Sequence, residues 1–195
     1  KLGGETLTTL KRQAYAQWKT REQAAAASEN SNVVPWFEVI PPPPADPSRG
    51  LGMLPPASAG DVFFDIEGYP LVEGGLEYLL GASYREGGDE KFIDWWAHDA
   101  VEEKASFEAF IDWVYARWTA DPAMHIYHYA PYEITATRKL MGRYATREDE
   151  VDMLLRRGVF VDLYRIVRQG LLFGDDSYSI KRIEKLYFAG RKADV

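Results

Sequence analysis

The stretch GDVFFDIEGYP, residues 60–70, constrains the fold more than any other part of the chain. Its aromatic and β-branched residues predict a strand that ends at a turn. Asp65 and Glu67 occupy alternate positions of that strand, so their side chains project from one face, about 7 Å apart. A buried carboxylate is costly unless it is paired or binds a metal. The face is therefore either a solvated edge-strand face or a site for hard cations such as Mg²⁺ or Mn²⁺.

The following sequence alternates between strand and helix patterns. Strands are predicted at 61–66, 77–85 and 91–97, and the next helix has an apolar face made of Phe107, Phe110, Ile111, Val114 and Trp118. Then come a strand, a helix, a strand and two helices, at 124–129, 132–144, 158–163, 164–172 and 177–188, the last with a serine N-cap. Up to residue 172 the order is β-β-β-α-β-α-β-α, which predicts an α/β fold with a mixed five-stranded sheet, three antiparallel strands followed by αβαβ, flanked by helices.

The first 59 residues have a different character. Residues 5–28 show helical spacing of Leu7, Leu10, Ala14 and Trp18, and residues 30–60 contain PPPPADP and LPPASAG, which disfavour both helix and sheet. We expect a helical appendage and connector over 1–59 and a domain over 60–195. The chain has no cysteine and no run of about 18 apolar residues, so we expect no disulfide, no membrane span and a cytoplasmic location.

Charge is unevenly distributed along the sequence. The net charge is −7, but residues 60–120 alone carry 14 acidic and four basic side chains. An overall acidic chain argues weakly against nucleic acid as a partner. Basic pairs nevertheless recur in the last third, at Arg156–Arg157, Arg165 with Arg168, and Lys181–Arg182 with Lys185. They indicate either a solvated mixed surface or patches that bind phosphate.

Two further acidic residues follow predicted strands. Glu133 falls in the first turn of the helix after Pro131, where the helix dipole stabilises a carboxylate whether or not it binds a metal. Asp162 can join a metal site or, as we expect, cap the following helix. His125 and His128 lie three apart on a strand and so face opposite sides, which argues against a zinc site built from the pair.

In this order and spacing, the motifs resemble those of the ribonuclease H-like DEDD exonuclease superfamily, and most of all the exonuclease-type domains that accompany bacterial RecB-type nuclease modules. The resemblance covers about residues 60–190. FFDIEG matches its Asp-x-Glu strand, and HYAPYE corresponds to a motif often written His-Asn-Ala-x-Phe-Asp, with Glu133 in the acidic position. VDLYRIV resembles the next strand-to-helix step, and SYSIKRIEKLYF resembles the segment before the third motif, where Tyr-Ser-Leu-Lys is frequent.

The chain departs from that pattern in two places. Tyr129 and Glu133 replace the Asn and Asp of the second motif, and a longer carboxylate alters the geometry of a metal ligand. The third motif, Tyr-x-x-x-Asp or His-x-x-x-x-Asp, supplies a fourth carboxylate and a general base, but neither form follows Lys181. Asp194 is the only later Asp. We therefore expect an exonuclease-like domain that is truncated at its C-terminus.

The resemblance implies a metal-dependent 3′→5′ exonuclease in which Asp65, Glu67 and Glu133 are catalytic ligands of two Mg²⁺ or Mn²⁺ ions. The expected partner is DNA or RNA with a single-stranded end, together with further domains of a longer parent protein. Tyr69, Tyr129 and Tyr132 would stack on bases unless they simply pack within the fold, and Lys181 would contact the substrate.

Two other functions remain open at the level of sequence. The domain can be a catalytically incomplete module that binds nucleic acid or docks within a larger nuclease or helicase, as the missing fourth carboxylate suggests. It can also be a phosphatase or another carboxylate–metal hydrolase on a different fold. That last alternative does not explain the strand order together with all three motif-like stretches.

Overall fold

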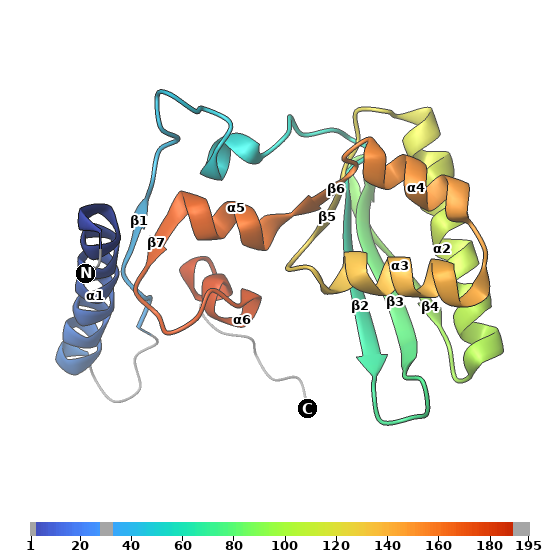
Figure 1. Ribbon diagram of the computed structural model, residues 1–195, viewed down its shortest axis with the longest axis horizontal. Coiled ribbons are helices and arrows are strands. Elements are labelled where there is room, and N and C mark those ends of the chain that lie inside the picture. Colours follow the sequence, from blue (N-terminus) through green and yellow to red (C-terminus); the bar gives the residue numbers. More distant parts are fainter. Residues whose placement is uncertain (1–2, 28–32, 189–195) are drawn as a thin grey trace. The chain divides into compact units, whose positions relative to one another are not determined.

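A computed structural model of the chain describes residues 3–27 and 33–188 (Figure 1). Ser28, the first residues of the expected connector and Asp194 lie outside these ranges. The described helices and strands are, in order, α1 (Gly4–Ala26), β1 (Phe37–Val39), η1 (Gly50–Met53), β2 (Val62–Tyr69), β3 (Leu76–Glu86), β4 (Asp89–Trp96), α2 (Ala100–Ala120), β5 (Ile126–His128), α3 (Tyr132–Tyr144), α4 (Glu148–Arg156), β6 (Phe160–Asp162), α5 (Leu163–Gly170), β7 (Leu171–Phe173), α6 (Ile180–Ile183) and η2 (Glu184–Leu186).

The chain forms two compact units. Unit 1 consists of residues 1–54 and 164–195, and unit 2 of residues 55–163. Unit 2 contains a five-stranded sheet in the order β4-β3-β2-β5-β6. The β4–β3 and β3–β2 pairs are antiparallel, whereas β2–β5 and β5–β6 are parallel. The mixed five-stranded sheet with flanking helices is confirmed. The predicted domain boundary, with an appendage and connector over 1–59 and a domain over 60–195, stays a prediction.

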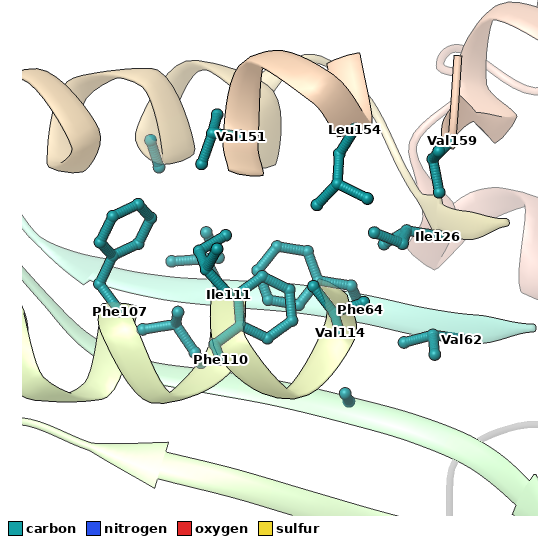
Figure 2. Close-up of a cluster of buried hydrophobic side chains, with 14 of the residues drawn as sticks. Val62, Phe64, Phe107, Phe110, Ile111, Val114, Ile126, Val151, Leu154 and Val159 are labelled. Atoms are coloured by element: carbon teal, nitrogen blue, oxygen red, sulfur yellow. The ribbon is translucent and has the colours of Figure 1, made fainter. Parts of the chain in front are cut away.

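The core of unit 2 lies between one face of this sheet and the helices α2, α3 and α4. Val62 and Phe64 of β2 face Phe110 and Val114 of α2, and the rings of Phe64 and Phe110 stack with centroids 4.0 Å apart (Figure 2). Of the five apolar residues predicted for the inner face of α2, the four from Phe107 to Val114 are fully buried, and Trp118 is partly buried against the same core, which confirms that helical face. Burial of large apolar side chains is the main contribution to the stability of such a core.

The helix α4 was not assigned from sequence. It contributes Val151 and Leu154 to the same core, as Figure 2 shows beside Ile126 and Val159. Its first turn is the acidic run Glu148–Glu150, which suits the positive end of a helix dipole. The acidic start and the short apolar stripe gave no sequence signal strong enough to distinguish a helix from a loop.

Unit 1 corrects three expectations. The connector at 30–60 contains a strand, because β1 precedes the proline run and pairs antiparallel with β7, and η1 lies between two groups of prolines. The helix expected over 164–172 ends at Gly170, and the chain then continues as β7. The helix expected over 177–188 is only the short α6 followed by η2, and Ser179 occupies the N-cap position without a side-chain bond to the helix.

The long helix α1 packs within unit 1. Gln13 Nε2 donates to the carbonyl oxygen of Phe173 at 2.8 Å, and the amide of Trp36 donates to Thr20 Oγ1 at 2.9 Å. These bonds link α1 to β7 and to the residue just before β1. No helix among the described residues combines the length and the apolar character needed to cross a membrane.

Candidate functional site

Strand β2 presents Asp65 and Glu67 on the face of the sheet opposite the helices. Phe64 and Ile66 are each 4% exposed and point into the core, whereas Asp65 and Glu67, which alternate with them, are exposed. The strand therefore has one apolar face and one face that carries both carboxylates. The prediction that Asp65 and Glu67 project together is confirmed.

The register of the sheet leaves Asp65 beside the end of a neighbouring strand. The last β2–β5 partners are Phe63 and Tyr127, and β5 ends one residue later at His128. Asp65 thus lies beyond the final parallel pair, next to the loop of residues 129–131 that leads into α3. Ligand sites of open α/β sheets form outside the carboxyl ends of parallel strands, where the chain crosses over to a helix.

The loop 129–131 is held by both flanking strands. Asp162 Oδ1, at the end of β6, accepts a hydrogen bond from the Ala130 amide at 3.0 Å. His128 Nδ1 lies 2.8 Å from the Ala130 carbonyl oxygen, so this ring nitrogen carries the proton and donates it. Between these bonds, Ala130 has φ of 76°, a conformation that is costly for a residue with a Cβ. Asp162 therefore fixes the loop before α3, and its role as a helix cap stays a prediction.

Glu133 enters the site from the first turn of α3. It is 4% exposed, and its Oε2 atom is buried without a hydrogen-bond partner within the described residues. His128 Nδ1 lies 3.4 Å from that oxygen but is directed to Ala130. A buried carboxylate oxygen without a donor is unfavourable by itself, and it calls either for a cation or for a proton shared with Asp65, whose side chain is in hydrogen-bond contact with Glu133.

Three negative charges meet at this place. The pKa of Asp65 is raised from its ordinary value, first by partial burial and then by the negative charges of Glu133 and Glu67. The carboxylates of the two predicted motifs are therefore electrostatic neighbours, although they are more than 60 residues apart in sequence.

The fit of this cluster to a divalent cation is partial. Its oxygen donors and uncompensated negative charge are what Mg²⁺ and Mn²⁺ prefer. Across residues 3–27 and 33–188, however, no three His, Asp or Glu side chains converge closely enough to hold one ion. The three residues thus agree with a cation site in chemistry and charge, while their side chains as placed do not form a complete ligand set.

The predicted substrate contacts lie at different places. Tyr69 and Tyr132 are about half exposed, and both line a cavity of about 530 Å³ between the loop after β2 and the start of α3. Tyr129 is partly buried in the loop held by Ala130. Lys181 is exposed in α6, which belongs to unit 1. Their contacts with nucleic acid stay predictions.

A buried glutamate at that cavity, Glu77, was not expected from the sequence. Glu77 is 4% exposed; it accepts hydrogen bonds from the Tyr132 hydroxyl at 2.6 Å and from Lys139 Nζ at 3.2 Å. Burial and this bond raise the pKa of Tyr132 well above its ordinary value. Tyr132 is therefore a hydrogen-bond donor at neutral pH. A lone Glu at the start of a strand resembles a solvated residue, so no sequence signal reveals this pair.

Comparison with known proteins supports the family. A family model described as the RNase H superfamily matches residues 62–195, which include β2, the loop 129–131 and α3. No curated protein and no solved structure matches the chain.

Proposed function

Because the chain belongs to the RNase H superfamily, whose members act as nucleases on nucleic acid, we propose that it hydrolyses phosphodiester bonds from a 3′ end with the help of divalent cations. The observation that most supports this proposal is the meeting of Asp65, Glu67 and Glu133 at the end of β5, with one Glu133 oxygen buried and unbonded. Such a concentration of carboxylates is unfavourable in a protein that uses it only for structure.

Each carboxylate has a role in the proposal. Asp65 would be shared between two Mg²⁺ or Mn²⁺ ions, and Glu67 would bind one ion and orient the attacking water. Glu133, which is fixed on α3, would hold the second ion directly or through water. When bound, the ions would supply positive charge to the scissile phosphate and lower the pKa of the attacking water.

The tyrosines beside the motifs would bind the nucleic-acid strand. Tyr69 and Tyr132 line the cavity next to the carboxylates, and a nucleobase can stack on either ring. Tyr129 would contact the nucleotide from the loop before α3, and Lys181 would contribute a basic contact to phosphate. The substrate we propose is DNA or RNA with a single-stranded end. The kinship to DEDD enzymes, the association with RecB-type modules and a cytoplasmic location belong to the same proposal.

One observation favours a second candidate function. Among the described residues, no three His, Asp or Glu side chains form a ligand set. A domain of this kind can bind nucleic acid, or dock within a larger nuclease or helicase, without cutting. Binding without cleavage distinguishes this function from the first.

The test is cleavage of end-labelled single-stranded DNA and RNA with Mn²⁺, comparing the parent protein with Asp65→Asn. Asp94→Asn is the matched control. Gly81 of β3 is the register partner of both Asp65 and Asp94, so Asp94 lies in the same row of the sheet, and it is exposed on the same face. We expect stepwise shortening from the 3′ end by the parent and by Asp94→Asn, and a loss of about a hundredfold or more in Asp65→Asn.

Other outcomes decide between the two candidates. Binding of the oligonucleotide without shortening, by a folded parent protein, would contradict hydrolysis and favour the binding module. Shortening that survives in Asp65→Asn would show that the carboxylate cluster is not the catalytic site. Whether DNA or RNA is shortened faster identifies the preferred substrate.

A further inference from the structure

A buried network links the candidate site to the interior of unit 2. Glu103 of α2 is fully buried and accepts three hydrogen bonds, from the Glu77 amide at 2.5 Å, from Arg143 Nη1 at 2.7 Å and from the Tyr144 hydroxyl at 2.5 Å. None of these groups belongs to the carboxylate cluster around Asp65. A carboxylate that is withdrawn from water needs such bonds, and their loss is costly.

Arg143 joins this carboxylate to the loop between β2 and β3. Besides Glu103, its guanidinium donates to the carbonyl oxygen of Gly75, at 3.2 Å, and to that of Gly74. Both glycines have positive φ, so the loop turns sharply where Arg143 binds it. A planar guanidinium can serve a carboxylate and two carbonyls at once, which the single ammonium of lysine cannot do in the same geometry.

The loop held by Arg143 forms one wall of the cavity that lies beside the carboxylates. The cavity has a volume of about 530 Å³. Residues between 69 and 76 line one side of it, and Tyr132 and Lys139 of α3 line the other. Glu77, whose amide is bonded to Glu103, bonds Tyr132 and Lys139 on the cavity side. The network therefore sets the distance between the two walls.

We infer that Arg143 is a positioning residue: bound to Glu103, it holds the loop of residues 70–75 at the width that a nucleic-acid strand needs to reach Asp65. This inference rests on the proposed function. Arg143 itself touches neither the carboxylate cluster nor the proposed path of the strand; it acts through the loop. Its removal is expected to weaken the binding of substrate more than the chemical step.

The test compares the parent protein with Arg143→Lys in three measurements. Hydrogen exchange of the peptide covering residues 70–76 reports the loop. Fluorescence anisotropy with a labelled single-stranded oligonucleotide and Ca²⁺ gives the Kd without cleavage. Cleavage with Mn²⁺ separates KM from kcat. We expect faster exchange in this loop, a Kd and KM raised about tenfold, and a kcat within about twofold of the parent.

Two control variants separate positioning from general stability. Tyr144→Phe removes one donor to Glu103 and leaves the bonds from Arg143 to the loop, so it is expected to lower the unfolding temperature without changing loop exchange or Kd. Arg138→Lys makes the same chemical change at an exposed position of α3 and is expected to behave as the parent.

Each result has a definite meaning. Parent-like loop exchange or a parent-like Kd in Arg143→Lys would overturn the inference, as would an equal rise of Kd in Tyr144→Phe. A parent that binds but does not cleave would overturn the proposed hydrolysis, and the Kd values would still decide the inference. A parent that neither binds nor cleaves would overturn both.

Discussion

At the scale of single residues, Gly68 shows how closely the Tyr132–Glu77 pair packs on β2. A Cβ at this position would collide with the Tyr132 hydroxyl and with a carboxylate oxygen of Glu77. The pairing of β2 with β3 also shifts register between Glu67 and Gly68. The irregular backbone and the missing side chain together let the Tyr132 hydroxyl lie against Gly68, where it donates to Glu77.

Gly68→Ala is expected to push the Tyr132–Glu77 pair away from β2. Because this pair lies between a strand and a helix, we expect a destabilisation of about 1–3 kcal/mol and a loss of cleavage of about tenfold or more. Urea unfolding and kcat/KM measure the two effects. Gly142→Ala, at an exposed position of α3 with open space around it, should instead stabilise by about 0.5–1 kcal/mol. A parent-like Gly68→Ala would show that the close contact is not required.

Asp65 makes the stability of the protein depend on pH. Its pKa is raised from 3.8 in the folded state, so the folded protein keeps this proton to a higher pH than the unfolded chain does. The free energy of unfolding therefore falls as the pH rises from 3.8 through the raised pKa.

The substitution Asp65→Asn removes the pH-dependent loss of unfolding free energy that Asp65 causes. Without divalent cations, we expect the variant to be more stable than the parent at pH 7, with the difference shrinking toward pH 4, as measured by urea unfolding. Mn²⁺ at about one hundred times its Kd should add about 2.7 kcal/mol to the parent and less to the variant. A parent that is unaffected by Mn²⁺ would count against a cation site at Asp65.

At the scale of secondary-structure elements, α4 shows which elements sequence reasoning identifies and which it does not. The strand β2 alternates buried with exposed residues, and α2 has a long apolar stripe, so their patterns predicted them. The helix α4 has nine residues, of which Val151 and Leu154 alone are fully buried. Short helices owe their stability to tertiary packing rather than to local propensity, and a local pattern therefore does not show them.

The packing of α4 on the sheet can be tested at Leu154. Leu154→Ala leaves a cavity beside Ile126 and Val159, and is expected to destabilise by about 2–5 kcal/mol. Met153→Ala, at an exposed neighbouring position, should change stability by less than about 0.5 kcal/mol. Equal effects of the two substitutions, measured by chemical unfolding, would contradict the observed orientation of α4.

At the scale of the whole molecule, the acidic residues of the candidate site follow from sequence, and the hydrogen-bond network beside the site does not. Asp65, Glu67 and Glu133 stand in motifs whose order and spacing are visible in the chain. The bonds of Glu77 with Lys139, and of Glu103 with Arg143, join residues from separate elements, and neither spacing nor composition records such contacts. The pairing of β1 with β7 is hidden for the same reason, because a three-residue strand beside prolines has no pattern of its own.

That pairing has a consequence for the order in which the protein is made. Residues 37–39 leave the ribosome long before residues 171–173, and residues 55–163 are synthesised in between. Contacts that are distant in sequence form late because closing a long loop costs entropy. The sheet of unit 2 can therefore assemble during translation, while β1 waits for its partner. During that interval, β1 carries an unpaired edge with Phe37 and Val39, and a chaperone or a neighbouring nascent chain can occupy it.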